Sequence, residues 1–258
     1  MICVHPRTRF AVAVLTGFMI SSGVWADWWQ FQGPTRNGVS PESGLMRSWP
    51  EGGPRELWSF PLGEGYAGPA VRDGEIYILD RVEERQDVLR CLDLATGAEL
   101  WNYAYDAPGS VGHSGSRTPP TVTETHVYSV GMLGDFLCVD RKTHQPVWRK
   151  NILADFGNKP SSWGVSQAPS LWRDLVIVAP QADDAFVAAY QRETGELVWQ
   201  SPGLGKVGYV TPVVTTLAGV EQAVMVAAYG QTAGISLENG SILWAYGGAG
   251  VHSTNADQ

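Results

Sequence analysis

The chain has 258 residues, of which 44% are apolar, and it carries 11 Trp and 30 Gly. This composition excludes a disordered chain and predicts a globular domain with a substantial core. Acidic residues outnumber basic ones by 26 to 18, so the formal net charge is −8. Because an acidic surface repels phosphate backbones and anionic headgroups, we expect no nucleic-acid partner and no anionic lipid partner.

Residues 1–26 have the pattern of a secretory signal peptide. Three residues that are or can be positively charged, His5, Arg7 and Arg9, precede an apolar run over 10–20, and small residues flank Trp25 before the expected cleavage site. The run is shorter than the roughly 20 residues of a membrane-spanning helix, although a retained anchor is the alternative. We therefore predict a signal peptide over 1–26, a mature domain over 27–258 in a secreted or periplasmic location, and no membrane span after cleavage.

One string of eleven residues occurs four times. The copies are CLDLATGAELW at 91–101, CVDRKTHQPVW at 138–148, AYQRETGELVW at 189–199 and GISLENGSILW at 234–244. Their final Trp residues lie 47, 51 and 45 positions apart, which is the period of a repeat architecture. Between them, short runs rich in Val, Ile and Tyr alternate apolar and polar residues, a pattern typical of strands and not of helices.

Each repeat divides into four predicted strands. In the first repeat they cover 66–71, 75–80, 88–93 and 99–105, and Asp73-Gly74 is a hairpin signal between the first two. A Pro stands at the expected start of each innermost strand, where a missing N–H is tolerated; these are Pro69, Pro120, Pro169 and Pro212. Four-stranded units repeated around an axis predict an all-β fold, a β-propeller of four-stranded antiparallel blades.

The repeated string has a turn at its centre. The Asp93 carboxylate can accept backbone N–H groups of this turn, and Gly97 supplies a positive φ. Trp101 then lies on the fourth strand, where its ring can fill the wedge between neighbouring blades. His144 replaces the turn Gly in the second copy and Gln191 replaces the Asp in the third, and we expect the turn to survive in both.

The repeat count predicts an incomplete ring. Trp58, in ELWSF, resembles the end of a fourth strand without the preceding three, and little chain follows Trp244. Because propellers have four to eight blades, we expect about four full blades forming an incomplete arc of a seven- or eight-bladed ring, with the domain truncated at its C-terminal end. A complete four-bladed ring is the alternative.

Cys91 and Cys138 occupy the same place in two copies of the string, where the other copies have Ala189 and Gly234. Equivalent positions of neighbouring blades are too far apart for a disulfide, whose Cα atoms must lie within about 7 Å. We expect both thiols to be free and buried at a position that requires a small side chain.

Candidate site residues lie in the loops that enter the innermost strands, because these loops surround one mouth of the channel. The candidates are His113, Arg117, Trp163, Gln167, Tyr209, His252, Asn255 and Asp257. A guanidinium offers paired donors to a carboxylate or quinone oxygen, and Trp163 could stack on a flat ring. The alternative is that these groups only hydrogen-bond one another and the loop backbones.

Other motifs indicate no further chemistry. The string GLGKVG at 203–208 matches a dinucleotide-binding pattern but precedes a strand and not a helix. His126 and His144 have no second ligand at metal spacing, so we predict no metal site.

The repeated string resembles the Trp-docking motif of the pyrroloquinoline-quinone (PQQ) repeat family, close to A-x-D-x-x-T-G-x-x-x-W. The segment DWWQFQGPTRNGVSPESGL at 27–45 also resembles the opening of exported bacterial PQQ-like propeller proteins, planctomycete-like ones in particular. The resemblance implies the propeller fold and two functional kinds. One is the quinoprotein alcohol dehydrogenases, which hold PQQ and Ca²⁺ on the axis; the other is non-catalytic propellers such as the outer-membrane barrel-assembly lipoprotein.

The sequence departs from both kinds. The dehydrogenases often have a disulfide between neighbouring Cys residues beside the quinone, which cannot form here, and no complete set of their carboxylate, Asn and Arg ligands can be mapped onto this chain. The lipoprotein's lipobox Cys is also absent. We therefore predict a binding or scaffold module for an unknown protein or small-molecule ligand at the channel. The alternative is a PQQ- and Ca²⁺-dependent dehydrogenase in which Arg117 and Trp163 grip PQQ.

Overall fold

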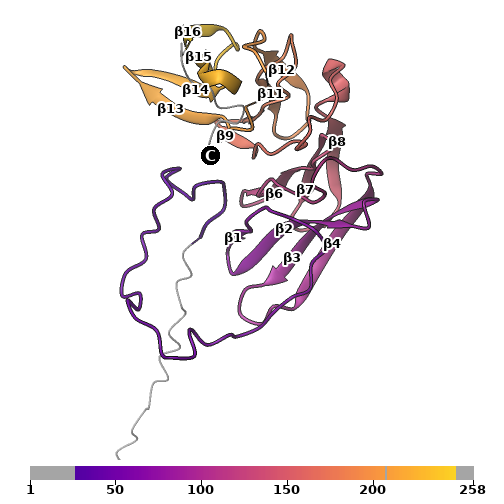
Figure 1. Ribbon diagram of the computed structural model, residues 1–258, viewed down its shortest axis with the longest axis vertical. Coiled ribbons are helices and arrows are strands. Elements are labelled where there is room, and N and C mark those ends of the chain that lie inside the picture. Colours follow the sequence, from indigo (N-terminus) through magenta and orange to yellow (C-terminus); the bar gives the residue numbers. More distant parts are fainter. Residues whose placement is uncertain (1–26, 207, 248–258) are drawn as a thin grey trace, which may run out of the picture.

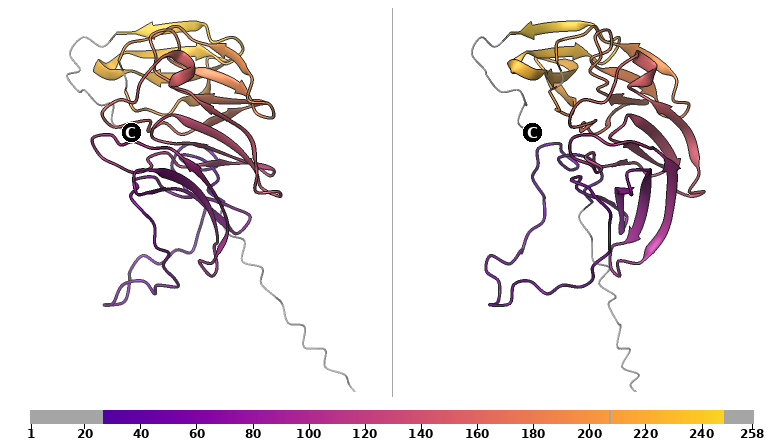
Figure 2. Two further views of the ribbon diagram at one scale, coloured as in Figure 1. Left: turned by 90° about the vertical axis from the view of Figure 1, so that its right-hand side faces the viewer. Right: turned by 45° about the vertical axis from the view of Figure 1, so that its right-hand side comes forward.

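The computed structural model describes residues 27–206 and 208–247, and within these ranges sixteen strands form four antiparallel sheets of four strands each. The strands of each sheet follow one another in chain order, as in propeller blades. The four sheets fan out as an arc and do not close into a ring (Figure 1; Figure 2). The predicted all-β fold and the four blades are confirmed, and the four-bladed ring is not the arrangement found.

The blades have the following bounds. Blade 1 contains β1 (Ala70–Arg72), β2 (Glu75–Val82), β3 (Gln86–Asp93) and β4 (Glu99–Asp106), and blade 2 contains β5 (Thr121–Val122), β6 (His126–Val130), β7 (Asp135–Asp140) and β8 (Pro146–Asn151). Blade 3 contains β9 (Ser170–Trp172), β10 (Leu175–Val178), β11 (Ala188–Gln191) and β12 (Leu197–Gln200), and blade 4 contains β13 (Val213–Leu217), β14 (Val220–Val226), β15 (Thr232–Ser236) and β16 (Ile242–Tyr246). Two short 3₁₀ turns, η1 (Ala154–Phe156) and η2 (Ala228–Gly230), complete the regular structure.

The predicted strands of blade 1 differ from the observed ones at two places. The innermost strand is shorter than 66–71, because the N–H groups of Tyr66 and Ala67 donate to the carbonyl of Ser116 instead of to β2. The β2–β3 hairpin is longer than predicted and turns at Glu83 and Glu84, both with φ +52°. Two consecutive positive φ values give a turn that matches strand twist, but glutamates are not its usual residues.

The prolines mark the innermost strands as predicted. Pro69, Pro120, Pro169 and Pro212 each stand one residue before the first strand of their blade. A residue at this place needs no N–H for the ladder, so a proline costs the sheet nothing.

The core consists of three clusters, one for each interface between neighbouring blades. Blade 2 shows how one sheet serves two clusters: Leu137 and Val139 of β7 pack toward blade 1, whereas Phe136 and Cys138 pack toward blade 3. Successive side chains of a strand point to opposite faces. Apolar residues therefore occur at both odd and even positions of these strands, because both faces of an inner blade are buried.

A tryptophan from one blade docks on the β-turn of the next. The indole N–H of Trp148 donates to the carbonyl of Arg192 at 3.0 Å, and that of Trp199 donates to the carbonyl of Leu237 at 2.8 Å. The indole N–H of Trp58, which precedes blade 1 in the chain, donates to the carbonyl of Leu94 at 3.0 Å. Trp101 stacks on the His144 ring, with 4.9 Å between centroids. The wedge role predicted for these rings is confirmed.

The turn at the centre of the string also forms as predicted. The Asp93 carboxylate accepts the backbone N–H of Thr96 at 2.7 Å, and Gly97 has a φ of +72°. His144 adopts a φ of +61°, and the third copy keeps its turn through a bond of 2.9 Å from the N–H of Gly195 to the carbonyl of Gln191. The backbone therefore holds the turn where the side chains depart from the motif.

The segment over 27–36 lies on the concave side of the arc, beside β1 (Figure 1). Trp28 pairs with Val71 of blade 1, and the carbonyl of Trp29 accepts the N–H of Val122 in blade 2 at 2.8 Å. The guanidinium of Arg36 donates to the carbonyl of Leu171 in blade 3 at 2.5 Å and to that of Val214 in blade 4 at 3.5 Å. One short segment thus contacts the first strand of every blade.

Cys91 and Cys138 are buried free thiols, as expected from their place in the string. Gly234, at the same place in blade 4, leaves no room for a side chain, because a β-carbon there would lie 2.1 Å from Oε1 of Gln222. Across 27–206 and 208–247, we find no helix with the length and apolar character needed to cross a membrane. The predicted signal peptide lies outside the described residues.

Candidate functional site

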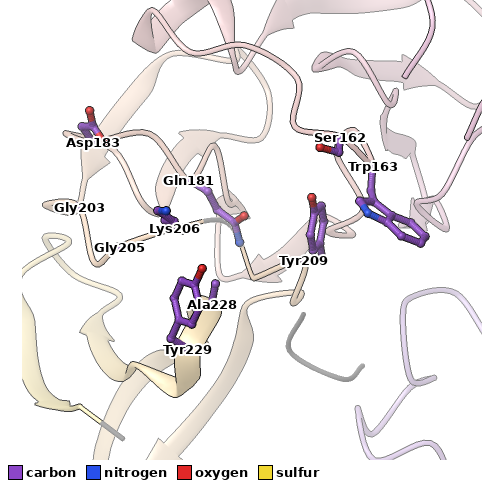
Figure 3. Close-up of a pocket in the computed structure, with 10 residues that line it drawn as sticks. All are labelled: Ser162, Trp163, Gln181, Asp183, Gly203, Gly205, Lys206, Tyr209, Ala228 and Tyr229. Carbon is purple, nitrogen blue, oxygen red and sulfur yellow. The ribbon is translucent and has the colours of Figure 1, made fainter. Parts of the chain in front are cut away.

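Loops of blades 3 and 4 surround a cavity of about 780 Å³. Two of the loops, over 158–169 and 205–212, are those that the sequence places at the channel mouth. The other two connect the second and third strands, β10 to β11 and β14 to β15. In an antiparallel blade these two kinds of loop leave the sheet at the same end. The side chains that line the cavity include Ser162, Trp163, Gln181, Asp183, Lys206, Tyr209 and Tyr229 (Figure 3).

Gln181 is the most unusual residue of the cavity. The residue is 6% exposed, yet neither the nitrogen nor the oxygen of its side-chain amide has a hydrogen-bond partner. The amide points toward the Tyr209 side of the cavity (Figure 3). Because buried polar groups are nearly always hydrogen-bonded, each exception requires an explanation. A ligand group or water that reaches the amide would supply the missing partners.

Three residues of the lining have backbones in the left-handed region. Gln181 has a φ of +52°, Tyr209 of +59° and Tyr229 of +63°. This conformation costs a residue other than glycine roughly 1–2 kcal/mol, and such strain gathers at ligand sites. All three strained residues lie around the same cavity, and their backbone conformation sets the direction in which each side chain leaves the chain.

The described part of the lining combines aromatic faces with one charge of each sign. Trp163 is 43% exposed and Tyr229 is 46% exposed, so both rings present free surface. The Lys206 ammonium lies 5.9 Å from the centroid of the Tyr229 ring, and Asp183 supplies a carboxylate on the wall. The cavity can thus cover flat apolar surface and make a few directed polar contacts.

Gly203, Gly205 and Lys206 of the string GLGKVG are part of the cavity wall. A β-carbon on Gly203 would lie 2.1 Å from the carbonyl oxygen of Asp183, and one on Gly208 would lie 2.4 Å from that of Val226. Glycine is needed at both positions because two backbones approach closely. The glycines therefore shape the wall between blades 3 and 4, and no helix follows them.

Among the predicted site residues, Trp163 and Tyr209 line the cavity. His113 and Arg117 come from the preceding loop and support Trp163: the His113 ring is 4.9 Å from the Trp163 ring, and the Arg117 guanidinium carbon is 5.8 Å from its centroid. Arg117 also donates to the carbonyl of His113. Burial lowers the pKa of Arg117.

The remaining predicted residues fall elsewhere. Gln167 is buried, and its side-chain oxygen accepts the N–H of Ser166 at 3.1 Å, so it serves the loop backbone and does not line the cavity. His252, Asn255 and Asp257 lie outside the described residues.

The sequence analysis did not single out Gln181, Lys206 or Tyr229. Gln181 and Tyr229 lie in connections between second and third strands, and no motif marks them. Only the strand topology could have indicated these residues. In an antiparallel blade, the connections between second and third strands lie at the same end as the loops around the channel mouth.

The lining does not fit bound PQQ with Ca²⁺. PQQ is a flat tricarboxylic acid, and Lys206 is the one cation among the lining residues that the structure describes. Calcium takes six to eight oxygen ligands, whereas no group of three or more His, Cys, Asp or Glu residues in 27–206 and 208–247 could hold a metal ion. The aromatic rings could stack on a flat molecule, but the charges around them do not match the three carboxylates of PQQ.

A family model described as outer membrane protein assembly factor BamB matches residues 47–130 and 84–257. The chain belongs to this PQQ-repeat propeller family. The match covers all four blades, so the repeats found in the sequence are the repeats of the family.

Relatives of known function share part of the chain. The dehydrogenase subunit of a quinone alcohol dehydrogenase from Gluconacetobacter polyoxogenes is 29% identical over 145 residues, which is 51% of this chain and 19% of that protein. The quinoprotein alcohol dehydrogenase PedH from Pseudomonas putida is 26% identical over 173 residues, which is 60% of this chain and 27% of that protein. The chain thus spans about a fifth to a quarter of the length of these curated relatives.

Solved structures share the fold. BamB from Moraxella catarrhalis superposes with a TM-score of 0.54 at 19% identity, covering 77% of this chain and 53% of that one. A europium-containing methanol dehydrogenase superposes with a TM-score of 0.55 at 15% identity, covering 75% of this chain and 44% of that one. At these identities the likeness concerns the propeller fold alone.

Proposed function

We propose that this PQQ-repeat propeller is a binding module whose ligand occupies the cavity between blades 3 and 4. The observation that carries the proposal is the Gln181 amide, buried in the cavity wall with both polar atoms unpartnered. A fold that buries an amide without protein partners loses free energy. A ligand that pairs with this amide recovers that loss, so the site is prepared for binding.

The chemistry of the cavity favours binding over catalysis. Among the described residues, the lining has one carboxylate, on Asp183, and one ammonium, on Lys206, and these two groups form no ion pair with each other. General acid–base catalysis needs a titratable group held against the reacting atoms. Aromatic faces and a fixed amide instead recognise a molecule and leave it unchanged.

Binding is tested by isothermal titration calorimetry on the full chain with four classes of probe: neutral trisaccharides, aromatic carboxylates, short peptides, and PQQ with Ca²⁺. We expect at least one class to bind, and the Gln181→Gly variant to bind it about tenfold more weakly. Glycine accepts a positive φ without strain, so this variant removes the amide and keeps the fold. Absence of binding in all four classes, or equal binding by the variant, would reject the proposal.

A quinoprotein alcohol dehydrogenase is the second candidate, favoured by the sequence relatives named above and by the Trp163 ring with Arg117 beside it. It is tested by titration with PQQ and Ca²⁺ followed by dye-linked alcohol oxidation. Micromolar PQQ binding with turnover would replace the binding module by an enzyme. No heat and no turnover would exclude the enzyme.

We also propose that the protein is exported. The support is the leader-like pattern of residues 1–26 and a family model whose description places an assembly factor at the outer membrane. N-terminal sequencing of the protein from cell fractions tests this. A mature start at Asp27 in the exported fraction is expected, and an uncleaved chain confined to the cytoplasm would contradict it.

A further inference from the structure

We infer that the ligand of the cavity between blades 3 and 4 is an uncharged saccharide. The inference rests on the proposed function and adds the chemical class of the ligand.

The charge of the lining favours a neutral ligand. Lys206 and Asp183 contribute one charge of each sign, and the other lining residues within 27–206 and 208–247 have uncharged side chains. A ligand with several carboxylates or phosphates requires several cations or a helix N-terminus around it. A neutral ligand can instead use the ammonium as a donor and the carboxylate as an acceptor, without leaving a charge unbalanced.

The Gln181 amide favours hydroxyl groups. An amide presents donors on its nitrogen and an acceptor on its oxygen, and both are unpartnered here. Two neighbouring hydroxyls of a sugar can each donate and accept, so they can pair with both atoms at once. A purely apolar ligand would displace water and leave the amide without a hydrogen-bond partner. An unpartnered amide costs free energy that a water-filled cavity does not cost.

The exposed rings favour a flat, partly apolar molecule. Trp163 and Tyr229 are each more than two-fifths exposed although both line the cavity. The C–H face of a pyranose ring is apolar and flat, and it can cover an aromatic face while its hydroxyls reach outward to polar groups. Small-ligand sites typically combine apolar faces with a few fixed polar groups in this way.

The backbone around the cavity disfavours an extended peptide. Each lining residue that the structure describes lies in a loop or in η2, and none of them belongs to a strand. Peptides that bind by adding a strand need an open sheet edge for their main-chain hydrogen bonds. The cavity offers side chains and glycine backbones instead.

The test uses the full chain with cellotriose, maltotriose and N-acetylated chitotriose as probes, followed by saturation-transfer NMR and calorimetry. We expect at least one of them to bind with a Kd on the order of 1 mM or below. We expect Gln181→Gly and Tyr229→Ala to weaken that binding about tenfold. A trimer of galacturonic acid, which carries carboxylates, is expected to bind more weakly than the neutral probes.

Ala218→Gly is the matched control, because Ala218 also has a positive φ, +48°, but lies in the β13–β14 turn and does not line the cavity. It relieves the same backbone strain and should leave saccharide binding unchanged. The inference is overturned if none of the three neutral probes binds, if Gln181→Gly binds them as well as the parent, or if the charged trimer binds more tightly. Gln181-dependent binding of a peptide or an aromatic carboxylate in place of a saccharide would overturn this inference and leave the proposed binding function standing.

Discussion

The Trp148 ring packs directly against Gly195 of the next blade, so closely that a β-carbon at position 195 would lie 2.7 Å from Cδ2 of the indole. The same relationship joins Trp199 to Gly240, at 2.7 Å from Cε3, and Trp58 to Gly97, at 2.4 Å from Cδ2. The glycine and the tryptophan of the repeated string therefore meet across an interface and not within one blade. Each copy of the string therefore contributes its tryptophan to one interface between blades and its glycine to another.

Replacing Gly195 by Ala should destabilise the protein by about 3 kcal/mol, from the positive φ and from the clash with Trp148. Gly74→Ala provides the control, since Gly74 has a similar φ, +78°, and nothing within 4 Å of the added β-carbon. This variant should lose only roughly 1 kcal/mol. Urea unfolding of both variants measures the difference, and equal losses would mean that the indole does not constrain position 195.

The Arg36→Ala variant should lose about 2 kcal/mol, because the guanidinium bonds to carbonyls of blades 3 and 4 and its removal leaves them unpaired. Arg36→Lys should lose less but not recover the parent value, since an ammonium lacks the planar fork. Arg55→Ala, at an exposed position, serves as the control. Should thermal unfolding show the same midpoint for Arg36→Ala and Arg55→Ala, the segment over 27–36 would not hold the blades together.

The turn carboxylates should make stability depend on pH. The Thr96 hydroxyl and N–H lower the pKa of Asp93, and the N–H of Thr143 lowers that of Asp140. A lowered pKa stabilises the fold above the pKa of the unfolded chain, about 3.9, and the gain is lost as pH falls through the folded pKa. The stability gap between the parent and Asp93→Asn/Asp140→Asn should therefore be largest near neutral pH and shrink in acid.

Denaturation curves at several pH values between 7 and 3 measure this gap. Thr96→Val tests the cause, because it removes the hydroxyl that contributes most to the shift of Asp93. The NMR titration midpoint of Asp93 should rise in this variant. A gap that stays constant through the acid range would contradict the assignment.

The two thiols should not react in the native state. Burial raises the pKa of Cys91 to about 12 and that of Cys138 to about 12, so both stay protonated at neutral pH. We expect labelling by a chromogenic disulfide reagent only when the chain unfolds, and a Ser40→Cys variant at an exposed position should react at once. Rapid labelling of the parent under native conditions would show that the inter-blade interfaces open.

The fold could be predicted because its signals are local and recur. Trp101, Gly97 and Asp93 fall at fixed offsets within one short string, and each acts through its own turn or through the next copy of that turn. The prolines before each first strand act in the same way. Even departures such as His144 were tolerable because the backbone bond closes the turn.

The candidate site depended on the tertiary structure. Trp163 and Tyr209 could be placed at the channel mouth from the sequence, because the loops entering the first strands are identified by the repeat. Gln181 and Tyr229 lie 48 positions apart in connections without a motif, and only the packing of blade 3 against blade 4 brings them to one cavity. A repeat specifies each unit through short-range contacts, whereas a cavity between units depends on their relative placement, which the sequence of either unit does not encode alone.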